Sequence, residues 1–311
     1  MFRRMYSVPH FLEDIPGVWK NKRSHGFRVP INCLPLIDKP LPEGTEKLSL
    51  ALSSKYLHDW VGDFLMEHQK AIINKGLNRE GFHAWSPPGS GKTLCGIVWL
   101  AAHAGPKVVI TKAAARGTWR EEIRKYSSFE PLMLTGHKPF RLSNQKNVIY
   151  ITAWETLMHW QKELKSLRID ALVMDEIHWA KNPKRVKAVV GKDGRSKWEP
   201  LSNTAAASMA VAHSAQRRLG LTATPIPNRP KDLWAQLDLV EPWQWGTFHT
   251  FGVRYCGGYQ DTYGWKYDEL SNGEELQERL RWSKHNTSQK AINARLPNKR
   301  RQVVYLEQSE Q

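Results

Sequence analysis

The sequence has few cysteines, and they lie far apart. The 311 residues include only Cys33, Cys95 and Cys256, and no two of them form a Cys-x-x-Cys pair. Neither a zinc site built on paired cysteines nor a disulfide framework is therefore indicated. This cysteine usage is typical of a protein from a reducing compartment.

Long apolar runs are also missing. No stretch approaches the roughly 18 consecutive apolar residues that a transmembrane helix needs. Residues 1–16 carry charges and prolines where a signal peptide would have its apolar core. We therefore expect a soluble, intracellular protein, cytoplasmic or, in a eukaryote, nuclear, with no membrane partner.

Acidic residues are scarce relative to basic ones. There are 46 Lys and Arg against 30 Asp and Glu, which leaves a formal net charge of +16. The basic residues gather in three segments: residues 279–301 hold eight with no acidic residue, residues 181–197 hold seven, and residues 1–30 hold six. Clustered positive charge suits a polyanion such as nucleic acid. A solvated surface or contact with an anionic membrane would produce the same pattern.

The apolar content is sufficient for a packed core. Hydrophobic residues make up 41% of the chain and aromatic residues 10%, which excludes a disordered tail or a coiled coil. Residues 1–64 are rich in Pro and Gly and predict an irregular N-terminal arm or small subdomain. Residues 65–242 alternate short apolar runs with amphipathic stretches, and residues 243–311 form an aromatic, Gly-rich and then basic segment.

The alternation within residues 65–242 predicts an α/β fold, with a mainly parallel sheet flanked by helices on both faces. The strand candidates are Gly81–Trp85, Lys107–Thr111, Asn147–Thr152, Ile169–Met174 and Arg218–Thr222. The helix candidates are Thr93–His103, Thr118–Tyr126, Trp154–Leu164 and Lys231–Leu239. Ligands of such sheets bind at the carboxyl ends of the strands.

A glycine-rich segment, Ser86-Pro87-Pro88-Gly89-Ser90-Gly91-Lys92-Thr93, stands between a strand candidate and a helix candidate. In this context the glycines allow the backbone amides to turn inward around a phosphate, and the helix N-terminus faces the same group. Lys92 would neutralise the β and γ phosphates of ATP, and the Thr93 hydroxyl would bind Mg²⁺. Since the two prolines lack amide donors, the predicted cradle consists of Gly89, Ser90, Gly91, Lys92 and Thr93. An ordinary strand-to-helix turn is the less favoured interpretation.

Two adjacent carboxylates follow another buried strand candidate. Asp175 and Glu176 come directly after Leu172-Val173-Met174. Asp175 would hold the same Mg²⁺ as Thr93, and Glu176 would orient or deprotonate the attacking water. A solvated strand end is the alternative for such a pair, but the phosphate loop earlier in the chain makes it improbable.

Together with several other stretches in the same order, these motifs resemble the first motor lobe of superfamily 2 helicases, and within them the Swi/Snf-type translocases. The similar stretches are Gln69 in Leu65-Met66-Glu67-His68-Gln69, Val109-Ile110-Thr111-Lys112 with Trp119 and Glu122, Ile151–Leu157, Asp175–His178 with Lys181-Asn182, and Leu221–Pro225 with Asn228 and Leu233-Trp234. The stretches most similar to the annealing-helicase subgroup are Phe251–Cys256, Tyr263–Trp265 and Leu296-Pro297. The resemblance covers about residue 65 to the end and implies a RecA-like lobe.

The resemblance implies roles around the nucleotide. Gln69 would read the adenine of ATP. Thr222, Ala223 and Thr224 would couple the state of ATP to strand binding. His178 would act with the two carboxylates and link them to this coupling segment, although a buried histidine with satisfied hydrogen bonds is the structural alternative.

It also implies contacts to a nucleic-acid backbone. Phosphate contacts to DNA, expected to be a duplex, are predicted for Lys112, Arg116 and Thr152, because cations and hydroxyls position a duplex without reading its sequence. Trp119 and Trp154 are instead predicted to be packing residues.

The sequence departs from the family at two places. Trp282-Ser283-Lys284-His285 stands where the family has Arg-Arg-x-Lys, and the chain ends shortly after Val303-Val304-Tyr305, where the family crosses into a second lobe that supplies an arginine to the ATP site. We expect the first lobe of a DNA-dependent ATPase that moves on or remodels DNA, with a second-lobe chain or C-terminal half as its partner. One alternative is a non-hydrolysing nucleic-acid-binding fragment or subunit that needs the second lobe in trans. The other is a DEAD-box-like RNA helicase, which the Asp175–His178 stretch disfavours.

Overall fold

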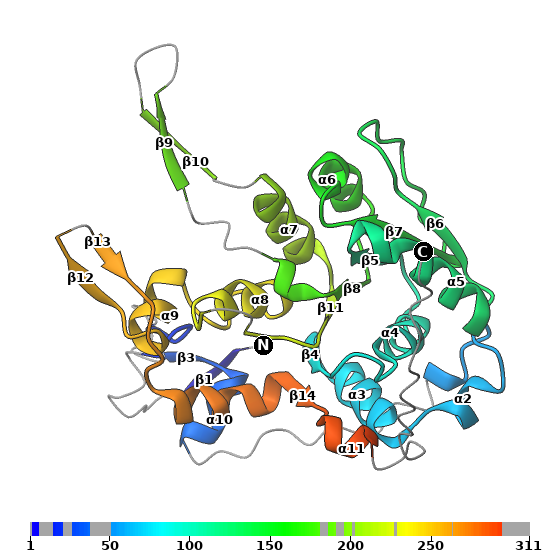
Figure 1. The fold of residues 1–311 in the computed structure, drawn as a ribbon, viewed down its shortest axis with the longest axis horizontal. Coiled ribbons are helices and arrows are strands. Elements are labelled where there is room, and N and C mark those ends of the chain that lie inside the picture. Colours follow the sequence, from blue (N-terminus) through cyan, green and yellow to red (C-terminus); the bar gives the residue numbers. More distant parts are fainter. Residues whose placement is uncertain are drawn as a thin grey trace, which may run out of the picture.

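A seven-stranded sheet forms the centre of the protein (Figure 1). The structure is a computed structural model, and it describes residues 2–5, 15–20, 27–37, 51–180, 186–190, 196–200, 203–226, 229–262 and 264–293. In spatial order its strands are β14 (Lys284–Asn286), β4 (Gly81–Trp85), β11 (Arg217–Thr222), β8 (Ala171–Asp175), β5 (Lys107–Thr111), β7 (Val148–Ala153) and β6 (Glu130–Met133). Each neighbouring pair is parallel. The predicted fold class is confirmed, and the five predicted strands lie within two residues of their expected bounds.

Helices cover both faces of this sheet, because successive side chains of each strand point to opposite sides. On one face Val109 and Val173 pack against α3 (Glu67–Leu77), α4 (Lys92–Ala101) and α5 (Arg116–Tyr126). On the other face Val108 and Leu172 pack against α6 (Leu157–Ser166), α7 (Asn203–Ser214) and the end of α8 (Asp232–Val240). Strands that are buried on both faces have continuous apolar sequences, which is why their pattern is clear in the chain.

The N-terminal residues are packed against the lobe. Ala51, Leu57 and Val61 belong to the same buried cluster as α3 and α4, and α2 (Val61–Phe64) lies beside them. Further upstream, β1 (Phe2–Met5), β3 (Phe27–Pro30) and β2 (Trp19–Lys20) form a small antiparallel sheet that leads into a 3₁₀ helix, η2 (Ile31–Ile37).

Residues after 242 share a core with the residues before it. A buried cluster joins Trp85 and Trp234 to Trp245 and Tyr255. The elements that follow α8 are α9 (Phe248–Tyr255), a hairpin of β12 (Tyr259–Asp261) and β13 (Gly264–Lys266), α10 (Gly273–Ser283) and α11 (Gln289–Asn293). Strand β14, which lies between α10 and α11 in the chain, pairs with β4 of the main sheet. Residues before and after position 242 thus contribute to one buried cluster.

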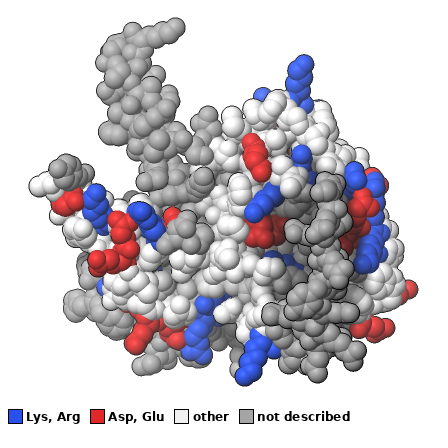
Figure 2. Space-filling view, in the orientation of Figure 1, with Lys and Arg blue, Asp and Glu red and all other residues white. Residues whose placement is uncertain are grey.

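Among the residues that the structure describes, the basic side chains of segment 279–301 do not gather on one exposed surface. Arg279, from the predicted basic segment, is fully buried, and Arg281 pairs with Glu278. On the face drawn in Figure 2, Lys and Arg lie interspersed with Asp and Glu. From the cluster at 181–197, the structure describes the strands β9 (Val186–Val190) and β10 (Ser196–Pro200), which pair as a projecting hairpin (Figure 1). Within the described parts of the chain, no helix is long and apolar enough to cross a membrane.

Candidate nucleotide site

The predicted phosphate loop connects β4 to α4 at the carboxyl edge of the sheet. Gly89 and Gly91 have φ angles of +75° and +76°, a region that favours glycine. At Gly91 a Cβ atom would lie 2.2 Å from Gln69 Nε2, so the Gln69 side chain would have to move, and the positive φ angle disfavours any residue other than glycine. Gln69 itself is buried and donates from Nε2 to the Ser90 carbonyl oxygen at 3.1 Å. The Gln69 side chain thus packs directly against the glycine loop.

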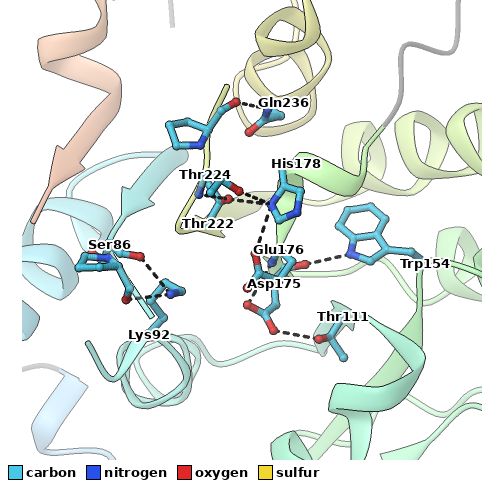
Figure 3. Close-up of polar contacts among 12 residues, drawn as sticks. Ser86, Lys92, Thr111, Trp154, Asp175, Glu176, His178, Thr222, Thr224 and Gln236 are labelled. Carbon is cyan, nitrogen blue, oxygen red and sulfur yellow. Dashed lines mark hydrogen bonds and ion pairs between the residues drawn. The ribbon is translucent and has the colours of Figure 1, made fainter. Parts of the chain in front are cut away.

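The side chain of Lys92 folds back onto the first residues of this loop. Its Nζ donates to the carbonyl oxygens of Ser86 and Pro87 at 3.0 and 3.1 Å (Figure 3). Burial lowers the pKa of Lys92, and the nearby carboxylates of Glu176 and Asp175 oppose that shift. The lysine therefore sits between the loop and the two predicted catalytic carboxylates.

Ser86, which stands at the first glycine of the common phosphate-loop pattern Gly-x-x-x-x-Gly-Lys-Ser/Thr, anchors the start of the loop. Its amide donates to the Thr222 carbonyl oxygen at 3.0 Å, and its hydroxyl donates to Thr287 Oγ1 at 3.1 Å. The buried Thr287 comes directly after β14, 201 residues later in the chain, so no local pattern could reveal this contact. The serine thus ties the loop to strands on both sides of β4.

Asp175 ends β8 and is fixed by three hydrogen bonds to its carboxylate. Its Oδ2 accepts from Thr111 Oγ1 and from Trp119 Nε1, each at 2.9 Å, and its Oδ1 accepts from the Glu176 amide at 3.0 Å. Its carbonyl oxygen accepts from Trp154 Nε1 at 2.9 Å (Figure 3). The two tryptophans are core residues, as predicted, with 1% and 2% of their surface exposed. Their polar contacts to Asp175 were not predicted.

His178 joins the carboxylates to the segment after β11. Its Nδ1 lies 2.9 Å from Thr222 Oγ1, 3.2 Å from Glu176 Oε2 and 3.4 Å from Thr224 Oγ1 (Figure 3). Thr222 Oγ1 also accepts from the Thr224 amide at 3.1 Å, across Ala223. The geometry therefore brings together His178, Glu176 and the coupling segment predicted from the sequence.

The lowered pKa of His178 gives a pH test of its burial at this position. Burial lowers that pKa, while the Glu176 carboxylate opposes the shift. Because the unfolded chain then binds more protons than the folded one near pH 6, His178's contribution to stability is present above its unfolded pKa of about 6.5 and is lost as the pH falls below it. We expect the melting temperature of the wild type to fall more steeply from about pH 7.5 to 5.5 than that of His178→Gln. Parallel curves for the two proteins would contradict this assignment.

The donor set fits a nucleotide polyphosphate with its metal. The loop glycines place amides at the N-terminus of α4, where anions bind, and Lys92 supplies a cation. Thr93, in the first turn of α4, and Asp175 offer the hydroxyl and carboxylate oxygens that Mg²⁺ prefers. These residues are all near the carboxyl edge of the sheet, where parallel sheets bind their ligands.

The three predicted phosphate contacts differ in position. Lys112 Nζ lies 4.7 Å from the centre of the Trp179 ring, which is 42% exposed, and Arg116 reaches the carbonyl oxygens of Ala113 and Leu134. Thr152 differs from the expectation. It lies inside β7 with none of its surface exposed, so its side chain does not reach a bound strand in this structure.

Two family models match the chain. The SNF2-related domain matches residues 200–311, and the type III restriction enzyme res subunit matches residues 64–227, more than half of the chain. A similar solved structure is the Sulfolobus solfataricus SWI2/SNF2 ATPase core domain, with a TM-score of 0.56 and 19% identity over 83% of this chain and 50% of that one. A second, titled as the same core in complex with dsDNA, has a TM-score of 0.55 and 18% identity over 82% and 48%. At these identities the likeness shows the fold.

Curated relatives agree with these matches. SWI/SNF-related matrix-associated actin-dependent regulator of chromatin subfamily A-like protein 1 of Xenopus laevis is 29% identical over 245 residues, which are 77% of this chain and 24% of that protein. DNA annealing helicase and endonuclease ZRANB3 of Bos taurus is 25% identical over 274 residues, 83% of this chain and 23% of that protein. The chain thus spans about a quarter of the length of these relatives. With its ordered motifs and fold, the chain belongs to the superfamily 2 helicases of the Swi/Snf type, as their N-terminal, RecA-like motor lobe.

Proposed function

We propose that this chain binds ATP with Mg²⁺ and is the first lobe of a DNA-dependent ATPase that moves along or remodels DNA. The observation that carries the proposal is the contact of His178 with both Glu176 and Thr222, because it joins the water-activating position to the coupling segment. That contact lies at the same edge of the sheet as the loop held by Lys92.

Each residue has a distinct task in this proposal. Gln69 holds the adenine, and the amides from Gly89 to Thr93 hold the phosphates. Lys92 leaves the carbonyl oxygens of its own loop for the β and γ phosphates. Thr93 and Asp175 would hold Mg²⁺, which would supply positive charge beside the phosphates. Glu176 orients the attacking water and accepts its proton.

Duplex DNA is the proposed partner on the side of Lys112 and Arg116. The support is the family itself, one member of which was solved with double-stranded DNA, and the half-buried position of both cations close to the site. Contacts of this type go to the sugar-phosphate backbone, which allows movement along any sequence. An intracellular location, where DNA and ATP are both present, follows from this proposal.

We also propose that full turnover needs a second lobe, in the same chain or in trans. In phosphoryl transfer, an arginine that stabilises the transition state accounts for about 10³ to 10⁵ in rate. The alternative, a non-hydrolysing fragment or subunit, differs from this proposal only in the activity of the chain alone. It predicts that nucleotide and DNA bind but that the added lobe is required for any turnover.

Replacing Lys92 by Ala tests the proposal. Charge-assisted hydrogen bonds contribute about 1.5–3 kcal/mol each, so binding of Mg·ATP should weaken by about 10- to 100-fold, and DNA-stimulated turnover should be lost. Lys162→Ala, which removes an exposed lysine of α6, is the matched control and should bind like the wild type. Isothermal titration and an ATPase assay with duplex DNA or RNA provide the readouts. Turnover that survives Lys92→Ala would overturn the site, and stimulation by RNA over duplex DNA would favour the DEAD-box alternative.

A further inference from the structure

Two tryptophans and a threonine donate the side-chain hydrogen bonds that Asp175 receives from other segments. Trp119 Nε1 and Thr111 Oγ1 both reach Oδ2 at 2.9 Å, and Trp154 Nε1 reaches the carbonyl oxygen at 2.9 Å. All three side chains are almost completely buried, with at most 2% of their surface exposed. The position of this carboxylate therefore depends on where these three donors stand.

Trp119 connects Asp175 to two helices at once. It belongs to α5, whose first residue is Arg116. Its ring also rests on Gly96 of α4, where a Cβ atom would come within 2.8 Å of the ring atom Cη2. A shift of α5 would therefore act on both the carboxylate and the helix that begins at Lys92.

Trp154 and Thr111 connect Asp175 to the ends of two strands. The Trp154 amide donates to the Thr111 carbonyl oxygen at 2.9 Å. The carboxylate of the next residue, Glu155, accepts from the Ala113 amide at 3.2 Å. Lys112 lies between Thr111 and Ala113, so the segment that carries one proposed DNA contact is bonded on one side to Trp154, which holds Asp175, and on the other to Glu155, the next residue of the chain.

Packing alone does not require these hydrogen bonds. Trp99 and Trp160 are also fully buried, yet their indole nitrogens have no hydrogen-bond partner among the described residues. This sequence therefore tolerates indole N–H groups that only fill space. At Trp119 and Trp154 the N–H groups instead meet the same residue, Asp175, from two different elements.

We infer that Trp119, Trp154 and Thr111 are positioning residues that transmit DNA binding at Lys112 and Arg116 to Asp175. The inference rests on the proposed function and extends it to the regulation of the site. When a bound DNA strand shifts the segments 111–119 and 152–155, the indole and hydroxyl donors in these segments shift the Asp175 carboxylate with them. By reciprocity, the same contacts make Mg·ATP change the affinity for DNA.

A binding cycle without any hydrolysis tests the inference. The dissociation constant for duplex DNA is measured with and without a non-hydrolysable ATP analogue and Mg²⁺, and the ratio of the two is the coupling factor. In the wild type this factor should lie at about 5- to 150-fold, the usual range for coupled sites. Trp119→Phe and Trp154→Phe remove the N–H but keep an aromatic ring, and the factor should fall toward one. Trp160→Phe, the matched control, should keep the wild-type factor.

The outcomes separate this inference from the proposed function. A merely structural role would lower the melting temperature of a variant but leave the coupling factor unchanged, so an unchanged factor in both variants overturns the inference. A wild-type factor of one, with both ligands bound, also overturns it and leaves the proposed function standing. A wild type that binds neither ligand overturns both.

A second readout needs no nucleotide. The indole ¹⁵N–¹H signals of Trp119, Trp154 and Trp160, each assigned by its Phe variant, are followed as duplex DNA is added. The signals of Trp119 and Trp154 should shift, while that of Trp160 stays in place. If a Phe variant fails to fold, Thr111→Val removes one donor to Oδ2 with little change of shape and should lower the coupling factor. Stationary Trp119 and Trp154 signals with DNA bound would contradict the inference.

Discussion

Glu176→Gln will slow ATP hydrolysis by about 10²- to 10⁴-fold, the usual contribution of a general base, while Mg·ATP still binds. Glu176 follows β8 with a φ angle of +49°, a left-handed conformation that is uncommon for residues other than glycine. Such backbone strain is often found at functional sites. At this turn the two neighbouring carboxylates have different partners: Asp175 accepts from Thr111, and Glu176 contacts His178. Glutamine keeps the size of the side chain but accepts no proton at neutral pH.

Single-turnover hydrolysis, with the protein in excess over labelled ATP and saturating duplex DNA, measures this loss even when turnover is slow. Glu130→Gln is the matched control, because Glu130 is an exposed carboxylate at the start of β6. It should hydrolyse ATP at the wild-type rate. If Glu176→Gln also does, another group activates the water, and the assignment of Glu176 is wrong.

The sequence predicted those parts of the fold that depend on local patterns. Strands β4, β5 and β8 are buried along their whole length, so their residues are continuously apolar or nearly so and can be found without the structure. The loop from Ser86 to Thr93 was predictable because two glycines with positive φ angles must stand at fixed positions before a helix. In both cases the structural requirement, burial of a strand or a positive φ angle in a turn, restricts residues that are neighbours in the sequence.

Other parts depend on contacts between distant segments. Strand β14 has the sequence Lys-His-Asn and no apolar side chain, yet it joins the sheet because α10 brings it beside β4. Trp119 and Trp154 have the spacing of ordinary core residues, and nothing in the sequence around either one indicates that Asp175 accepts from both. Thr152, near the end of β7, was predicted to contact a phosphate of the DNA backbone, but its side chain is fully buried.

Arg279→Met should lower the free energy of unfolding by about 3–5 kcal/mol, because each buried acceptor left without its donor costs about 1–3 kcal/mol. Arg279 was counted from the sequence as part of a basic surface, but it is fully buried in α10. Its guanidinium donates to Asn32 Oδ1 at 3.0 Å, to the Gln244 carbonyl oxygen at 2.8 Å and to the Tyr255 hydroxyl at 2.9 Å. Methionine would leave these three acceptors buried without their donor.

The contact with Asn32 makes this cluster a link between η2 and the lobe. Urea unfolding followed by circular dichroism measures the loss, and Arg281→Met is the matched control. Arg281 lies two residues further along α10, and its side chain is 72% exposed, so its loss should change stability by less than about 0.5 kcal/mol. Arg279→Lys should not restore stability, because a single ammonium cannot reproduce the planar fork that reaches three acceptors. Equal unfolding midpoints for Arg279→Met and Arg281→Met would mean that residues 31–37 are held by their apolar contacts alone.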